Sequence, residues 1–461
     1  MSSLVPENLT TLTEAAAAVR TGETTATELV CECLEQISAA DGQLRAFVSV
    51  QESEALARAS ELDALAGSGR LAGPLHGIPV AIKDIIDIAG LPTAAGMSAK
   101  SVQATTGRDQ PAARDAALVS RLRDAGAVLI GKTVTTAFAC FDPPATRNPH
   151  DPDRTPGGSS SGSAAAVAAG MCFAAIGSQT GGSITRPAAF CGVAGAKPSL
   201  GRVPCAGVVP ISEHLDHPGP IARSVADLAV MLDVLVSYLP TDPTSRNTPP
   251  PGLFASLDSL ASTTALVPRL GRLEGLFAER ADAEATAAID SAMTAWETAG
   301  ARACRAELPT GFDEVLDHHR IVLVGGLAAN HRDYYPDHVD EYPDGLGGLI
   351  AEGLDFRMTR FIEARRHQMR LKSDILGCFD ECDVLVCPAA VGGAPDASTT
   401  GDPSMNAPWS YTGLPSVSFP IAETSGGMSL SVQLIGRPDG EAELFGVAAW
   451  CEEHHTAAHI S

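Results

Sequence analysis

The chain has 461 residues, and the 45% that are hydrophobic can fill a large core. Its formal net charge is −23, from 32 basic and 55 acidic residues, which disfavours nucleic acid or an anionic membrane as the main partner. The N-terminus lacks a basic leader with an apolar segment, and no apolar run reaches the roughly eighteen residues of a membrane helix, so we expect a cytoplasmic protein.

The first half of the chain alternates helical and strand patterns. Residues 10–70 are Ala-rich with apolar residues at helical spacing, which predicts two or three helices. The apolar run Ile78–Ile82 predicts a buried strand, 116–125 a helix and 127–133 another strand. This alternation favours an α/β layered architecture. Residues 240–251, rich in Pro and Thr, are typical of a surface connector.

The second half continues in the same way. Helices are predicted over 283–300 and around 355–378, the latter long and amphipathic. Strands are predicted in the segments TTALVP (263–268), DVLVCP (383–388), LPSVSFPIAE (414–423) and MSLSVQLIGRP (428–438). The last two read as a strand pair that returns to the same sheet.

The cysteines and histidines do not suggest a metal centre. Eleven cysteines is an odd count without repeated C-x-x-C pairs, which favours reduced thiols. Cys378, Cys382 and Cys387 come nearest to a cluster. Cys382 and Cys387 bracket the mostly apolar run DVLV, so buried small hydrophobes are favoured over metal ligands. The twelve histidines contain no H-E-x-x-H motif. We therefore expect no metal.

Two loops rich in Gly and Ser each contain a candidate for the catalytic serine. RTPGGSSSGSAAAVAAG (154–170) contains G-x-S-x-G centred on Ser160, but a nucleophile elbow follows a hydrophobic strand and this match follows a polar, Pro-containing loop. The same loop lacks the G-K-[ST] ending and the G-x-G-x-x-G motif of phosphate-binding loops. A single loop of this kind is usually a flexible turn. A second one nearby, IGSQTGGSITRP (176–187), makes a functional site the better interpretation.

The T-G-G-S segment of the second loop offers both a nucleophile and an oxyanion hole. Its glycines let the backbone N–H groups of Thr180, Gly181, Gly182 and Ser183 converge beside a hydroxyl. Serine needs a base, and Lys83, one of only five lysines, lies within the apolar run PVAIKDIIDI. Lowering a lysine pKa from about 10.4 to about 7 takes roughly 4 to 5 kcal/mol, which desolvation can supply.

These residues resemble the amidase signature family. The resemblance rests on GIPVAIKDIIDIAG, TRNPHDPDRTPGGSSSGSAAAVAAG and GSQTGGSITRPAAFCGVAGAKPSLGRVP, with weaker agreement at LDHPGPIARSVADLA and SVQLIGRP. It implies a Ser-cisSer-Lys triad with Lys83 as base, Ser159 as the bridging serine after a cis peptide bond, and Ser183 as nucleophile. Ser160 is then outside the triad.

The resemblance also implies the fold, a single α/β/α domain over 1–461 around a large mixed sheet. This replaces the two or three domains that the length alone would allow. Its expected parts are N-terminal helices (10–70), a catalytic core (71–240), a variable region covering the substrate pocket (270–379), and C-terminal strands and a helix completing the core (383–461). The loop 405–412 is expected to help shape the pocket.

The implied activity is hydrolysis of a small-molecule amide, often also of esters, through an acyl-enzyme and without a cofactor. Carbamates carry the same carbonyl and are plausible substrates. Homodimers are common in the family. The alternative is the A subunit of a glutamine-dependent tRNA amidotransferase, which typically reads S-D-T-G-G-S-I-R-Q-P where this chain reads SQTGGSITRP. That difference favours a free-standing hydrolase, and retention of all three triad residues argues against a non-catalytic binding protein.

Four further residues lie near the motifs. Arg186 either binds a substrate carboxylate or pairs with an internal Asp, and the sequence favours neither. Asp216 is expected to order loops near the site rather than to take part in the chemistry. His76 and His217 invite a Ser-His-Asp interpretation, but a lysine base leaves them without a role.

Overall fold

The computed structural model describes residues 3–98, 110–255, 267–455 and 458–459. Its N-terminal part contains three helices, as predicted: α1 (Leu12–Thr21), α2 (Ala26–Leu44) and α3 (Glu52–Gly67). The first two begin with capping boxes, Thr11 with Glu14 and Thr25 with Glu28, which satisfy backbone N–H groups at the helix start. Strand β1 (Phe47–Val50) lies between α2 and α3 and was not predicted.

Three parallel strands form the part of the sheet that carries the site. They are β2 (Pro79–Lys83), β3 (Val128–Thr133) and β4 (Ala174–Gln179), with β2 in the middle and every residue buried. The first two, and helix α5 (Ala117–Asp124), lie where the sequence predicts them. Because parallel strands end at the same edge of a sheet, Lys83 and the loop after Gln179 are brought together there.

Helix α6 (Ser161–Ala168) packs directly on these strands and on β6 (His217–Ala222). All eight of its residues, SGSAAAVA, are small or medium-sized and buried. At Gly162 a Cβ atom would lie 2.2 Å from the Ala46 carbonyl oxygen and 2.5 Å from the Val134 nitrogen. Glycine is therefore required at this close approach.

The remaining strands extend the same sheet. They are β5 (Ala194–Lys197), β7 (Arg269–Leu273), β8 (Arg302–Ala306), β9 (Val384–Pro388), β10 (Ser416–Glu423), β11 (Ser429–Ile435) and β12 (Ala458–His459). Within the described ranges, the order is β1-β3-β2-β4-β6-β5-β10-β11-β9-β7-β8, with β12 beside β10. Both parallel and antiparallel pairs occur, and the expected strand pair β10–β11 is antiparallel. The α/β class and the large mixed sheet are thus confirmed.

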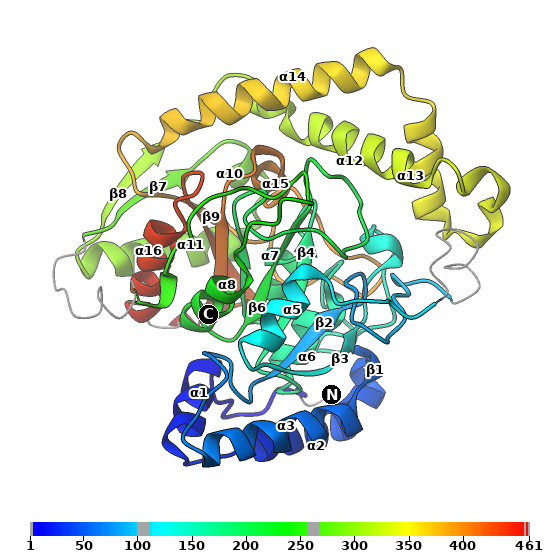
Figure 1. Cartoon of the computed structure of the whole chain (residues 1–461). Coiled ribbons are helices and arrows are strands. Elements are labelled where there is room, and N and C mark those ends of the chain that lie inside the picture. The colour runs from blue at the N-terminus through cyan, green and yellow to red at the C-terminus, as the bar shows by residue number, and fades with distance from the viewer. Residues whose placement is uncertain (1–2, 99–109, 256–266, 456–457, 460–461) are drawn as a thin grey trace.

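Helices surround this sheet (Figure 1). They are α7 (Thr185–Phe190), α8 (Val225–Leu235), α10 (Leu276–Arg280), α11 (Ala283–Thr298), α12 (Val315–His331), α13 (Asp344–Leu354), α14 (Met358–Asp374), α15 (Ala407–Thr412) and α16 (Glu441–Glu453). In Figure 1, α12, α13 and α14 lie across the top of the molecule, on the opposite side from α1–α3. None of the helices in the described ranges is long and apolar enough to cross a membrane.

The later sequence predictions agree with these bounds except at one segment. The predicted helices 283–300 and 355–378 correspond to α11 and α14, the latter continued by a 3-10 turn over Ile375–Phe379. The predicted strand TTALVP was misplaced. Its residues 263–266 lie outside the described residues, and Val267 and Pro268 precede β7, which begins at Arg269.

Candidate active site

Lys83 ends strand β2 and is fully buried. Its Nζ donates a hydrogen bond to Ser159 Oγ at 2.7 Å and to Ser178 Oγ at 2.9 Å, and the Ser178 carbonyl oxygen lies 3.4 Å away. Burial lowers the pKa of Lys83 to about 7, partly opposed by Asp216 and Cys140. A large fraction of the amine is therefore neutral near pH 7.

Burial alone does not distinguish Lys83 from two other lysines. Lys132 and Lys197 are also buried. Lys132 forms an ion pair with Asp84 at 2.7 Å. Lys197 donates to the carbonyl oxygens of Pro198 and Leu414, and burial lowers its pKa well below the ordinary value. What singles out Lys83 is its direct contact with Ser159 at the cavity of the T-G-G-S loop.

The two candidate serines of the first loop have different surroundings. Ser159 follows a cis Gly158–Ser159 peptide bond, is 2% exposed and lines the same cavity as Ser183. Ser160 is fully buried, and its Oγ exchanges hydrogen bonds of 3.3 Å with the backbone of Ser178 on β4. Ser160 therefore packs on the sheet and is not among the residues that line this cavity.

Ser183 lies in the loop between β4 and α7, where the cavity has a volume of about 290 Å³. The residues Thr180, Gly181, Gly182 and Ser183 all line it. Ser183 is half-buried, and its hydroxyl makes no hydrogen bond with any residue that the structure describes. The structure thus places Ser159 and Ser183 on one cavity wall without a hydrogen bond between them.

The carbonyl groups of this loop are held by residues far away in sequence. The Thr180 oxygen accepts a 2.9 Å hydrogen bond from His319 Nε2, and the Gly181 oxygen accepts one of 2.7 Å from Ser410 Oγ. In a planar trans peptide the C=O and the following N–H point in opposite directions, so these contacts also fix the N–H groups of Gly181 and Gly182. Sequence reasoning missed both positioning residues.

Gln179 and Asp216 complete the support of the loop. The Gln179 side-chain oxygen accepts hydrogen bonds from the backbone N–H groups of Ile184 and Thr185, just after Ser183. Asp216 accepts one of 2.6 Å from the Thr180 hydroxyl and two from the backbone of Ile211 and Ser212. Burial raises the pKa of Asp216 to about 6. These contacts fit the predicted loop-ordering role of Asp216.

Arg186 is 2% exposed and lines the cavity. Its Nε donates to the Thr400 carbonyl oxygen and its Nη2 to that of Gly158, each at 2.8 Å. Its Nη1 is buried without a hydrogen-bond partner among the described residues. Two backbone carbonyls therefore hold Arg186 in place of the internal Asp that the sequence allowed, and Nη1 is left without a hydrogen bond to the described residues.

His76 and His217 are not among the residues that line the cavity of Ser183. The His76 ring bonds the backbone of Ala72 and Leu62, whereas His217 Nδ1 contacts the Leu215 carbonyl oxygen at 2.5 Å. Burial lowers the pKa of His217 well below its ordinary value. Neither histidine belongs to the cavity lining of the described chain, so the geometry gives a Ser-His-Asp site no support.

Part of the remaining lining comes from the two regions that the sequence predicts to shape the pocket. Helix α12 supplies Leu316, Asp317, His319, Arg320 and Leu323, and α15 supplies Ala407. The first five belong to the variable region 270–379, and Ala407 belongs to the loop 405–412. The cysteines are free thiols, and Cys378, Cys382 and Cys387 are buried, as predicted.

Comparison with known proteins adds relatives that span nearly the whole chain. The family model described as Amidase matches residues 28–445. An amidase of Pseudomonas putida is 34% identical, covering 94% of this chain and 93% of the relative. The A subunit of the glutamyl-tRNA(Gln) amidotransferase of Chromohalobacter salexigens is 35% identical, with 95% of each chain covered.

Solved structures agree with the sequence comparison. A chain from the vestigial protein complex that reveals the origins of an s-triazine catabolic enzyme is 29% identical, with a TM-score of 0.89 over 98% of this chain and 100% of that one. The native peptide amidase of Stenotrophomonas maltophilia is 30% identical, with a TM-score of 0.85 over 98% of both chains. The likeness therefore extends over the entire fold.

Proposed function

Because the chain belongs to the amidase signature family of amide-hydrolysing enzymes, we propose that it cleaves small-molecule amides with a Lys83–Ser159–Ser183 triad. The observation that carries the proposal is the 2.7 Å contact of buried Lys83 Nζ with Ser159 Oγ, on the wall of the cavity that Ser183 also lines. A lysine with a pKa of about 7 can serve as a neutral base.

In this mechanism neutral Lys83 accepts a proton from Ser159 while Ser159 accepts one from Ser183. The Ser183 oxygen then bonds to the substrate carbonyl carbon, and the N–H groups of Thr180 to Ser183 stabilise the oxyanion. The proton returns through Ser159 to the leaving nitrogen as the C–N bond breaks. Water attacks the acyl-enzyme by the same relay, which releases the acid and restores the Ser183 hydroxyl.

The cavity favours a small substrate with an apolar acyl group. A volume of about 290 Å³ is at the lower end for small-molecule sites. Its apolar lining consists of Ala139, Cys140, Phe141, Ile211, Leu316, Leu323, Pro403 and Ala407. Amides are the primary substrates that we propose, and esters and carbamates follow from the shared carbonyl chemistry. The protein acts in the cytoplasm without a cofactor, alone or as a homodimer.

The amidotransferase alternative makes a different prediction for the isolated chain. We expect the purified protein to hydrolyse aliphatic or aryl amides without any added protein, because the triad, the oxyanion loop and the cavity all come from one chain. The measurement is ammonia or amine release over a panel of aliphatic, aryl and acidic amides, carbamates and glutamine. Hydrolysis restricted to glutamine and dependent on partner proteins would refute the proposal.

Arg186 tests whether the site accepts acidic substrates. We propose that its unpartnered Nη1 binds a substrate carboxylate, while Nε and Nη2 anchor the side chain. Arg186→Met should then raise KM for acidic amides at least about tenfold more than for neutral ones. Thermal unfolding of the variant provides the control. Equal losses on both substrate types would instead assign Arg186 to holding the Gly158 and Thr400 carbonyls.

A further inference from the structure

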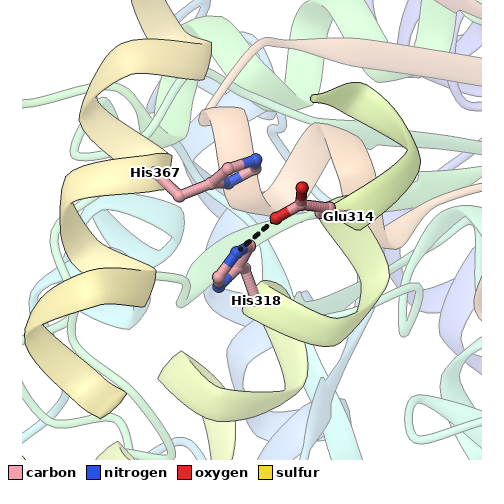
Figure 2. A group of neighbouring side chains, drawn as sticks. All are labelled: Glu314, His318 and His367. Atoms are coloured by element: carbon pink, nitrogen blue, oxygen red, sulfur yellow. Dashed lines mark hydrogen bonds and ion pairs between the residues drawn. The ribbon is translucent and has the colours of Figure 1, made fainter. Parts of the chain in front are cut away.

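One group of polar side chains outside the triad is held together by its own contacts (Figure 2). Glu314 Oε2 lies 3.1 Å from His318 Nε2, and His367 projects toward both from α14. The His367 ring nitrogens lie 2.9 Å from the Gly311 carbonyl oxygen and 3.0 Å from the Tyr411 hydroxyl. The two imidazole rings are stacked, so their in-plane lone pairs cannot meet at one ion. These contacts join the start of α12 to α14.

A second cavity, of about 210 Å³, adjoins the candidate substrate cavity. Ile211 lines both. Thr180 lines the substrate cavity, and its hydroxyl donates a hydrogen bond to Asp216, which lines the second cavity. Ser178, whose Oγ accepts a hydrogen bond from Lys83, also lines the second cavity. A ligand in the second cavity would therefore contact residues that support the candidate triad.

The second cavity is small, largely apolar and open to solvent. Its apolar walls include Ile85, Val208, Val209 and Ile211. Exposed lining residues mark its mouth, namely Pro210, Glu213, Thr241 and Pro243. Its volume is below the range of roughly 300 to 1,000 Å³ that is usual for small-molecule sites. The cavity therefore suits a ligand of few heavy atoms with a short apolar chain.

The charged side chains that line the second cavity are acidic. They are Glu213, Asp216 and Asp242, and no lysine or arginine of the described ranges lines it. Asp216 and Asp242 accept hydrogen bonds from backbone N–H groups and hydroxyls, and neither forms an ion pair with a described lysine or arginine. Lys83 acts on Asp216 electrostatically without pairing with it. Carboxylates in a cleft with apolar walls concentrate a negative potential, which favours a cation.

His217 adds an unused hydrogen-bond acceptor. Its side chain is 1% exposed and lines the second cavity. Its Nδ1 lies 2.5 Å from the Leu215 carbonyl oxygen and 3.3 Å from that of Gln179, so Nδ1 carries the ring proton and Nε2 a lone pair. This buried Nε2 has no hydrogen-bond partner among the described residues, which is uncommon in native proteins. Lys197 and Lys372 act on the ring electrostatically, but neither lines the cavity.

We propose that the second cavity binds a small organic ammonium ion, with its charged head at the carboxylates and His217 Nε2 and its short apolar chain against Ile85 and Val208. An ammonium head supplies the positive charge and the N–H donors that the lining lacks. A carboxylate or phosphate ligand would be repelled by the same side chains. A neutral alcohol would supply a donor without the charge, so it serves as the comparison ligand.

Amide hydrolysis, the proposed reaction, releases ligands of this class. An aliphatic amine, whose pKa is close to the value of about 10.4 for lysine, is an ammonium ion at neutral pH. A product of the reaction would then occupy the second cavity beside Asp216 and Ser178, which contact Thr180 and Lys83. This link rests on the proposed function, whereas the binding of an ammonium ion does not require turnover.

Binding can be measured by calorimetry on the full-length protein with n-butylammonium, butan-1-ol and butyrate. We expect one n-butylammonium ion per chain, bound at least about tenfold more tightly than butan-1-ol, and no binding of butyrate. Asp216→Asn should weaken n-butylammonium binding at least about tenfold with little effect on butan-1-ol. Val208→Phe should fill the cavity and weaken binding of both. The exposed Asp124 and Val48, which do not line the cavity, provide the matched controls Asp124→Asn and Val48→Phe.

Three results would overturn the assignment. The first is no saturable binding of n-butylammonium to the wild-type protein. The second is an affinity for n-butylammonium no higher than for butan-1-ol or butyrate, which would show that the carboxylates do not select the ligand. The third is binding that persists undiminished in Asp216→Asn and Val208→Phe, which would place the ligand elsewhere. Thermal unfolding verifies that both variants are folded, and Glu213→Gln at the exposed mouth replaces either one that is not.

Discussion

Ser183→Ala is expected to lower kcat/KM by roughly 10⁴-fold or more and to abolish covalent labelling by a fluorophosphonate. The reason is that Ser183 is the hydroxyl among the proposed oxyanion donors, half-buried in the cavity and free of hydrogen bonds to the described residues. The measurements are steady-state kinetics on the best amide substrate and mass-spectrometric mapping of the labelled peptide.

Ser160→Ala is the matched control, because Ser160 forms the centre of the literal G-x-S-x-G match. Its hydroxyl bonds the Ser178 backbone at 3.3 Å, so the variant should lose about 1 kcal/mol of stability and keep most of its turnover and labelling. A fluorophosphonate adduct mapped to Ser160 would reverse the assignment of the nucleophile.

The second large effect concerns Lys83. The kcat/KM of the wild-type protein should rise with pH through about 7 and then level, because the neutral amine is the proposed base and burial lowers the pKa of Lys83 to about 7. Lys83→Ala should remove this rise together with most of the activity. Lys83→Arg should not restore it, because a guanidinium group stays protonated and cannot accept the proton of Ser159.

Asp216 needs its own control, since burial raises its pKa to about 6, close to the expected inflection. Asp216→Asn keeps an oxygen that can accept a hydrogen bond from the Thr180 hydroxyl, so the rise of kcat/KM with pH should persist if Lys83 causes it.

Substantial activity in Lys83→Arg would show that position 83 supplies only positive charge. His76 would then be the first residue to test as the base.

The same pKa shift affects stability with a definite sign. The unfolded chain binds the Lys83 proton up to pH values near 10.5, whereas the folded chain releases it near pH 7. The buried, protonated Lys83 therefore lowers the free energy of unfolding by its full amount below pH 7. This loss of stability becomes smaller as pH rises from about 7 to 10.5. Lys83→Met should raise the free energy of unfolding most at acidic pH, as measured by denaturant titrations at several pH values.

Local patterns predicted the parts of the site that depend on local sequence. The apolar run Ile78–Ile82 gave strand β2, and its position beside β4 explains why Lys83 meets the loop after Gln179. The T-G-G-S segment and the loop before α6 were likewise visible as motifs. Lys83 Nζ lies 2.7 Å from Ser159 Oγ, and Ser159 and Ser183 line one cavity, but the triad itself stays a prediction.

The supporting contacts had no such local signature. His319 reaches Thr180 across 139 residues, and Ser410 reaches Gly181 across 229. Neither residue stands in a pattern that differs from an ordinary amphipathic or irregular segment. Burial of a lysine was also an incomplete signal, because Lys132 and Lys197 are as buried as Lys83. Only the fold shows which of the three faces a serine at the cavity.

The hydrogen bonds from His319 and Ser410 to the Thr180–Ser183 loop have a consequence for the order in which the site forms during translation. A ribosome that has translated the first 240 codons has already supplied Lys83, Ser159 and Ser183, yet the nascent chain lacks both groups that fix the loop carbonyls. Domains emerge from the ribosome N-terminal part first. If Ser183 is the nucleophile, as we propose, we expect reactivity to arise only late in synthesis, and incomplete chains released by stalled ribosomes to lack the contacts that order the Thr180–Ser183 loop.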